Sequence, residues 1–202
     1  MPLAASGVVA SVTLLVAAHL LAESRGARVP RAATKVAASL GFVLLALLRG
    51  ADGAFERGIL AGLALSVVGD ALLVSARRPA FLAGLVAFLL AHVAYALSFA
   101  TAARPAWWAA LPILAALGLV LRWLWPHLGS MRTAVVAYCL VISVMLWLAL
   151  GVDRPEIRLG AALFYASDLF VARDRFVRPG FANRLVGLPL YYAAQVLFAL
   201  AV

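Results

Sequence analysis

Eight long apolar stretches constrain this chain more than any other feature of its sequence. Each runs for about 16–20 residues between arginine, proline or glycine residues, which is enough for a helix to cross roughly 30 Å of hydrocarbon. Backbone groups inside lipid must pair within their own segment, so these stretches are expected to be helices. They lie at residues 6–22, 33–49, 57–74, 80–99, 106–125, 132–151, 157–172 and 184–202.

The composition favours a membrane protein over a soluble one. The chain has 202 residues, of which 66% are hydrophobic and 12% charged, whereas a soluble domain carries about 45–50% apolar and about 25% charged residues. We therefore predict an all-α, polytopic transmembrane bundle of eight helices with short connections, in which residues 1–202 form a single integral membrane domain. The sequence does not specify an oligomeric state.

The basic residues lie mostly between the apolar stretches. A net charge of +9 would suggest nucleic acid in a soluble chain. Here topology control and contact with anionic membrane lipids explain it, and no nucleic-acid partner is expected. The loops after the first, third, fifth and seventh stretches carry eleven arginines, against five on the opposite side. The richer side should be cytoplasmic, with both termini outside, in a multi-pass protein of a bacterial inner membrane.

An internal repeat appears when the sequence is shifted by 98 residues against itself. The shift places Gly62 on Gly160 and Asp70 on Asp168. Because four stretches separate the two segments, they should cross the membrane in the same direction. This pattern indicates a parallel four-plus-four duplication about an axis along the membrane normal.

Two aspartates inside the stretches are the leading catalytic candidates. An ionisable group within a span costs roughly 2.5–3.5 kcal/mol on insertion scales, so each one needs a reason. Asp70 and Asp168 lie at matched depths near the predicted cytoplasmic ends. They could form structural ion pairs with Lys35 or nearby arginines. If they instead face each other, they would not ionise together, and the pair would offer one general acid and one general base.

Other polar and aromatic side chains inside the stretches are candidate substrate contacts. Lys35 is either a topology-setting lysine or a cation for a lipid phosphate or for Asp70. His92 lies near mid-membrane and is either hydrogen-bonded to a neighbouring helix or a proton-relay or lipid-positioning group. The same helical stripes hold Ser66, Phe88, Tyr95, Phe164, Tyr192 and Gln195.

Metal and nucleophile chemistry have little support in this sequence. Cys139 is the only cysteine, and the histidines lack a close carboxylate spacing, so no metal or cofactor is expected. His19 and His127 lie near the ends of stretches and are expected at the membrane interface. The sequence has no G-x-S-x-G, no H-E-x-x-H and no phosphate-binding glycine loop, which excludes serine-hydrolase and zinc-peptidase mechanisms.

Several short motifs carry a resemblance to a known family. They are Ser66–Leu73 (SVVGDALL), Gly84–Tyr95 (GLVAFLLAHVAY), Ala162–Leu169 (ALFYASDL), Tyr138 with Met145, and Tyr192–Gln195 (YAAQ). In this order they resemble the YhhN-type lysoplasmalogenase family of eight-span membrane proteins, from about the second stretch to the C-terminus. The resemblance implies that Asp70 and Asp168 form the acid/base pair and that Tyr138 joins the substrate contacts.

Family membership would imply an ether hydrolase. The expected reaction cleaves the vinyl ether bond of a lysoplasmalogen, a lysolipid, to a fatty aldehyde and glycerophospho-ethanolamine or -choline, although another lysolipid ether could be the substrate. One aspartic acid would protonate carbon, and the other would stabilise the cation and deprotonate water. A proton-coupled transporter of small molecules or lipids, and a non-catalytic lipid-binding protein, are the alternatives. Only a hydrolase would turn over in detergent.

The motifs also predict where the substrate would lie. We expect a cavity among the second, third, fourth, seventh and eighth stretches, polar at the two aspartates and lined deeper by Phe88, Tyr95 and Phe164. His92 and Gln195 should point inward.

Overall fold

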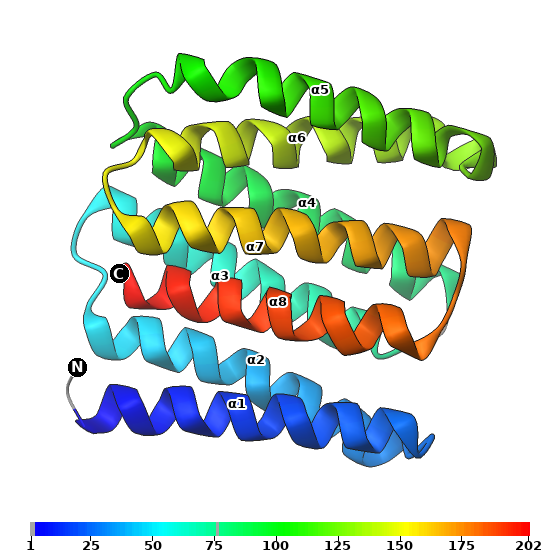
Figure 1. The fold of residues 1–202 in the computed structure, drawn as a ribbon. Coiled ribbons are helices and arrows are strands. Elements are labelled where there is room, and N and C mark those ends of the chain that lie inside the picture. The colour runs from blue at the N-terminus through cyan, green and yellow to red at the C-terminus, as the bar shows by residue number, and fades with distance from the viewer. Residues whose placement is uncertain (1–2, 76) are drawn as a thin grey trace.

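The eight apolar stretches form eight α-helices in a computed structural model that describes residues 3–75 and 77–202 (Figure 1). Two short 3₁₀ turns, η1 and η2, join α5 to α6, and a π-helical turn, η3, extends α7. The elements are α1 (Leu3–Ser24), α2 (Arg28–Arg49), α3 (Ala54–Leu73), α4 (Arg78–Ala100), α5 (Trp107–Leu124), η1 (Trp125–His127), η2 (Gly129–Met131), α6 (Arg132–Gly151), α7 (Pro155–Ala172), η3 (Arg173–Val177) and α8 (Phe181–Leu200).

The helix ends follow from local sequence. Gly26 and Gly50 have φ values of 67° and 88°, in the left-handed region that favours glycine, and they end α1 and α2. The helix α2 begins at Arg28, five residues earlier than predicted, because Pro30 fits the first turn, where a backbone N–H needs no helical partner. The helix α7 begins at Pro155 for the same reason.

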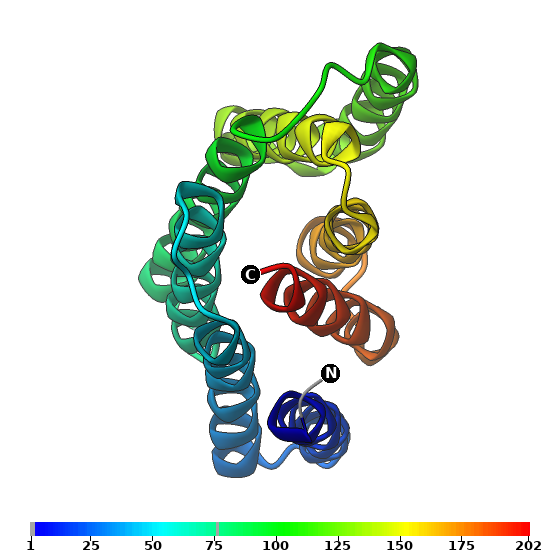
Figure 2. The same ribbon diagram turned by 90° about the vertical axis from the view of Figure 1, so that its left-hand side faces the viewer.

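The helices alternate in direction, as short connections predict. The connections after α1, α3, α5 and α7 lie at one end of the bundle, and both termini lie at the other (Figure 1). Viewed end on, α2, α3, α4 and α6 form a curved wall, α7 and α8 lie on its concave side, and α5 lies outside against α6 (Figure 2). The arginine-rich loops therefore share one end. That this end faces the cytoplasm remains a prediction.

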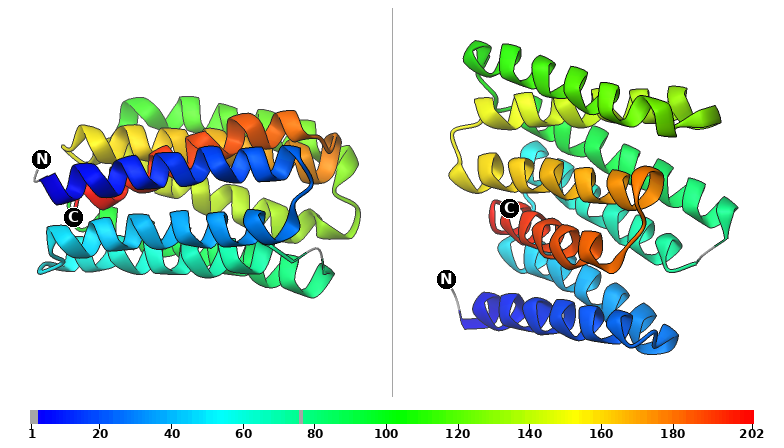
Figure 3. Two further views of the ribbon diagram at one scale, coloured as in Figure 1. Left: turned by 90° about the horizontal axis from the view of Figure 1, so that it is seen from below. Right: turned by 45° about the vertical axis from the view of Figure 1, so that its right-hand side comes forward.

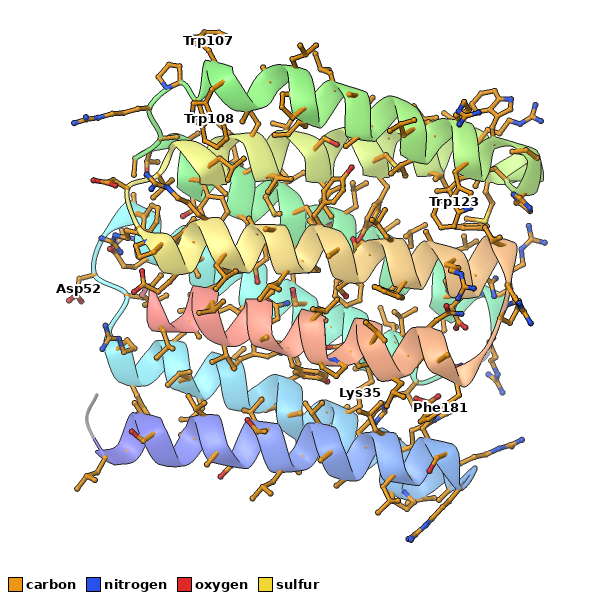
Figure 4. The ribbon with its side chains drawn as sticks, viewed as in Figure 1. Lys35, Asp52, Trp107, Trp108, Trp123 and Phe181 are labelled. Atoms are coloured by element: carbon orange, nitrogen blue, oxygen red, sulfur yellow. The ribbon has the colours of Figure 1, made fainter. Side chains whose placement is uncertain are left out.

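The outer surface is suited to lipid. By length and composition, five helical segments could cross a membrane, namely α1, α2, α4, the α5–η1 segment and the η2–α6 segment. The other three, α3, α7 and α8, carry five of the ten buried polar or charged residues in the described part of the chain. Leu97, Leu111 and Leu14 are 67–76% exposed on the outside. Trp107 and Trp108 lie at one end and Trp123 at the other (Figure 4), where an interfacial belt is expected. The chain is thus a multi-pass membrane bundle.

Helix packing follows the predicted repeat. A shift of 98 residues takes α2 onto α6 and α4 onto α8. In the structure α2 packs on α8, and the reciprocal pair, α6 on α4, also packs (Figure 3). This reciprocity is what a two-fold relation between the halves requires. The superposition of residues 33–99 on 131–197 remains a prediction.

Candidate active site

A cavity of about 550 Å³ contains both aspartates. All eight helices contribute to its lining, which is wider than the five predicted from sequence. The difference arises because α1 packs against α2 and α8, and the α5–α6 hairpin packs beside α7, so the cavity continues between them. Phe88 and Phe164 line it as predicted.

Asp70 lies at the centre of a dense set of donors. Its side chain is 2% exposed, and its Oδ1 is 3.1 Å from Lys35 Nζ. The Ser39 and Tyr191 hydroxyls each donate a hydrogen bond of 2.6 Å to Oδ2. One cation and two hydroxyl donors together match a carboxylate anion. Of the alternatives for Lys35, the structure selects the partner of Asp70.

A second layer holds these donors in place. The Tyr192 hydroxyl donates to the Lys35 carbonyl at 3.1 Å and lies 3.1 Å from the Ser39 hydroxyl. Tyr192 therefore ties α8 to α2 behind Asp70 and does not line the cavity. Ser39 was not predicted from the sequence, although it lies one helical turn after Lys35, a spacing that places both on the same face.

Asp168 has a different partner. Its Oδ2 lies 3.7 Å from Nε2 of His92, and the Asp168 side chain is 17% exposed toward the cavity. His92 Nδ1 donates to the Phe88 carbonyl at 2.7 Å, so Nε2 of the neutral ring is an acceptor. Within residues 3–75 and 77–202, neither Nε2 nor Oδ2 has a hydrogen-bond partner. Nε2 and Oδ2 thus face each other as two acceptors at 3.7 Å, which is beyond hydrogen-bonding distance.

The aromatic surroundings fix the His92 ring. Phe164 lies 4.5 Å away and Tyr138 lies 5.2 Å away, centroid to centroid. Both also line the cavity beside Asp168. Tyr138 and Phe164, which were predicted to contact the substrate, thus also hold the His92 ring in place.

Five predicted substrate contacts are absent from the cavity lining, namely His92 and Tyr192, described above, and Tyr95, Ser66 and Gln195. Tyr95, Ser66 and Gln195 are fully buried and do not contribute to the lining. The Tyr95 hydroxyl donates to Gln195 Oε1 at 2.7 Å, and its ring packs on Gly62. Ser66 donates to the Gly62 carbonyl at 2.9 Å. The expectation that Tyr95 lines the cavity is wrong, because its hydroxyl is directed to α8 and its ring fills the α3–α4 contact.

The cavity has two unlike ends. The charged end is lined by Glu23, Arg31, Asp174 and Arg184, from α1, α2, η3 and α8. The apolar end is lined by Val120, Leu124, Val135 and Ile142, from α5 and α6. Figure 1 places α1 and α2 at one edge of the bundle and α5 and α6 at the opposite edge, with α7 and α8 between them. Figure 4 shows Lys35 on the charged side.

His19 lies near the end of α1 and is enclosed by neighbouring side chains. It is 3% exposed, its Nε2 lies 3.5 Å from Glu23, and its Nδ1 lies 2.9 Å from the Arg31 carbonyl. Glu23 was not among the residues predicted from the sequence, although it lies one turn after His19. In the described part of the chain, no three His, Cys, Asp or Glu side chains come together as metal ligands do.

These features define a class of protein: a polytopic membrane bundle with two carboxylates, in unlike surroundings, facing one amphipathic cavity. The chain belongs to the YhhN family, which it matches over residues 30–202. Lysoplasmalogenase TMEM86B of Sus scrofa is 37% identical over 161 residues, covering 79% of this chain and 70% of that protein.

Two further relatives have the same activity in their names. Lysoplasmalogenase TMEM86B of Homo sapiens is 36% identical over 153 residues, covering 74% of this chain and 65% of the relative. The lysoplasmalogenase of Mycobacterium tuberculosis is 34% identical over 159 residues, covering 72% of this chain and 60% of the relative. No solved structure matches this chain.

Proposed function

We propose that this protein is a membrane hydrolase that cleaves the vinyl ether bond of lysoplasmalogen-type lysolipids. The products would be a fatty aldehyde and a glycerophospho-alcohol. The names of the relatives support the activity. The observation that carries the mechanism is that Asp70 is paired with a cation while Asp168 faces a histidine, on one cavity. Lysolipid and surrounding membrane lipids are the partners of this reaction.

In the first step, a proton is transferred to carbon. Protonation of a vinyl ether occurs on the carbon beyond the one that carries oxygen, and it leaves an oxocarbenium ion. We assign the donor to Asp168 in its protonated form, whose Oδ2 lies 3.7 Å from Nε2 of His92. Asp168, on α7, faces His92 of α4. The His92 ring packs on Tyr138 of α6, a helix that lines the apolar end of the cavity, and the carbon to be protonated belongs to the apolar chain of the lipid.

In the second step, water adds to the oxocarbenium ion. Asp70 stabilises this cation as an anion and takes the proton of the attacking water. The resulting hemiacetal then collapses: Asp70 returns its proton to the ether oxygen, and Asp168 accepts the proton of the hemiacetal hydroxyl. The carbon–oxygen bond breaks, aldehyde and alcohol leave, and both aspartates regain their starting states. The net reaction consumes one water.

The transporter alternative has weaker support. Transporter sites are typically formed by helices that are discontinuous near the midplane. Here α5 and α8 continue through their internal prolines, Pro112 and Pro189. We place the protein in a bacterial inner membrane with the arginine-rich end, and the mouth of the charged end, toward the cytoplasm.

Aldehyde release by the purified protein tests this function. The protein in detergent is incubated with a lysoplasmalogen, with the matching saturated alkyl ether and with an ester lysolipid. We expect aldehyde from the vinyl ether alone, because only its double bond can be protonated to an oxocarbenium ion. Activity without a sealed membrane would exclude transport as the sole function. No aldehyde from any vinyl ether lysolipid would contradict the proposal.

A further inference from the structure

The charged end of the cavity includes a helix that lies outside the family match. The match begins at residue 30, whereas α1 ends at Ser24. Nevertheless α1 supplies Glu23 to the lining, with a side chain that is only 8% exposed. Glu23 lies 3.5 Å from Arg31 on α2 and 3.2 Å from Arg184 on α8. Glu23, which lies outside the family-matched region, therefore pairs with two arginines that lie inside it.

A second carboxylate continues the cluster. The Arg184 guanidinium is also 3.6 Å from Asp174 in η3, and Asp174 accepts a 2.7 Å hydrogen bond from the Gly180 backbone. Two cations and two carboxylates thus alternate at the mouth. The arginine side chains remain 36% and 42% exposed, so they are accessible from the cavity.

Unused hydrogen-bonding capacity remains in this cluster. A guanidinium has five N–H donors, and a carboxylate has about four lone-pair sites. Arg31 directs only its Nη1 group to Glu23, at 3.5 Å. Arg184 directs Nε to Glu23 and Nη1 to Asp174, and Glu23 also faces Nε2 of His19 at 3.5 Å. The remaining donors can bind an anion, and the remaining carboxylate lone pairs can bind a cation, without disruption of the pairs already formed.

The spacing along α2 matches a glycerol backbone. Arg31 precedes Lys35 by one turn, about 6 Å along the helix, and Lys35 is 3.1 Å from Asp70. In a lysolipid, five bonds separate phosphorus from the ether oxygen at the other end of glycerol. An extended chain covers about 1.2 Å per bond, as in a polypeptide, or about 6 Å in all. A phosphate at Arg31 would place the ether bond beside Lys35 and Asp70.

We propose that Glu23, Arg31 and Arg184 form a headgroup site for a phosphodiester that carries an ammonium group. The arginines bind the phosphate, and Glu23 with Asp174 binds the ammonium. Alternating charge complements a zwitterion, whereas a phosphate alone would face two carboxylates without a cation of its own. The lipid chain then points toward the apolar end. The inference rests on the proposed function, since it assumes that the same cavity holds the lysolipid.

Binding of lipids that cannot be cleaved tests the headgroup site. The probes are a saturated 1-O-alkyl-glycerophosphocholine, the matching 1-O-alkyl-glycerol 3-phosphate and the matching 1-O-alkylglycerol, titrated into the full-length protein in detergent. We expect the zwitterion to bind about tenfold more tightly than either of the others, since it alone uses both charges. Glu23→Gln should remove the preference over the 3-phosphate. Arg184→Gln should weaken both phosphate lipids and leave the alkylglycerol unchanged.

Two control variants lie at the opposite end of the bundle. Glu156→Gln and Arg158→Gln make the same changes on α7, away from the cavity lining, and should leave all three affinities unchanged. Equal affinity of the wild type for the three probes would overturn the headgroup site. A uniform loss for all three in Glu23→Gln would also overturn it, because such a loss means that Glu23 serves only to pack α1.

The outcomes separate this inference from the proposed function. If the wild type prefers the zwitterion but releases no aldehyde from a lysoplasmalogen, the headgroup site stands and the hydrolase proposal fails. If it releases aldehyde but binds the three probes equally, the hydrolase proposal stands and the headgroup site is overturned.

Discussion

Asp70 and Asp168 occupy equivalent positions on α3 and α7, but the helices beside them supply different partners. Beside Asp70, α2 contributes Lys35 and Ser39. At the equivalent positions, 98 residues later on α6, stand Thr133 and Ala137. Beside Asp168, α4 contributes His92, and the equivalent residue of α8 is Leu190.

The 98-residue shift thus pairs two helices that carry one aspartate each but have different partners. Asp70 meets α2, from its own half of the sequence, and Asp168 meets α4, from the other half. Only the partner side chains differ: a cation and hydroxyl donors on one side, an imidazole on the other. Two identical carboxyl groups can take unlike roles in one reaction when their partners differ in this way.

Removal of either carboxyl should have the largest effect. We expect Asp70→Asn and Asp168→Asn each to lower aldehyde release by about 10²–10⁴-fold, because an amide can neither donate a carboxylic proton nor carry negative charge. Both variants should remain folded and in the membrane. Retention of more than about a tenth of wild-type turnover by either variant would show that the two carboxyl groups do not both take part in proton transfer.

The Lys35 ion pair should affect stability as well as activity. Lys35→Met leaves the Asp70 carboxylate buried without its cation, which typically costs about 3–5 kcal/mol of folding free energy. A thermal melt in detergent measures this loss. The double variant Lys35→Met with Asp70→Asn should regain stability but not activity. A single variant as stable as the wild type would mean that Asp70 does not depend on Lys35 for its charge.

His92 should matter less than the carboxyl it faces. His92→Gln removes the imidazole that faces Asp168 at 3.7 Å. Because this contact is too long for a hydrogen bond, we expect a loss of only about tenfold in rate, which corresponds to about 1.4 kcal/mol. His127→Gln, at an exposed position in η1, is the matched control and should be silent. A loss in His92→Gln as large as in Asp168→Asn would make the histidine the proton donor.

The smallest effects should come from two equivalent glycines. An added Cβ at Gly62 meets the Tyr95 ring, and one at Gly160 meets the Phe198 ring. We expect Gly62→Ala and Gly160→Ala each to destabilise the fold by about 1–3 kcal/mol, measured as a lowered Tm. Gly118→Ala on α5, with no atom within 4 Å of the new Cβ, should gain slightly from helix propensity. Tolerance at only one of the two positions would show unequal packing in the halves.

The sequence alone could identify the helices and the two carboxyls, because both are local signals. The length of an apolar stretch can be read directly from the sequence, and so can the position of a charged residue within it. The partners of Asp70 could not be identified in the same way, since Tyr191 reaches it from α8, 121 residues away. Which face of one helix meets another depends on rotations about the helix axes, which an Ala- and Leu-rich sequence specifies weakly.

The same limit explains the misplaced residues. Tyr95 and Gln195 were predicted to contact substrate because they lie on polar stripes, but a stripe cannot distinguish a cavity wall from a helix–helix contact. Their mutual 2.7 Å hydrogen bond places them in the contact. Glu23 was overlooked because it lies at a helix end, where a single carboxylate normally attracts no attention. Only the approach of α8 encloses it.

The unlike ends of the cavity have a consequence for turnover. The two products of the proposed reaction differ sharply in solubility: the aldehyde prefers the bilayer, and the glycerophospho-alcohol prefers water. A cavity with apolar residues toward α5 and α6 and charges toward α1 and α8 gives each product its own direction of departure. Neither product then has to pass the other, and a fresh lysolipid can enter from the membrane while the polar product is still diffusing away.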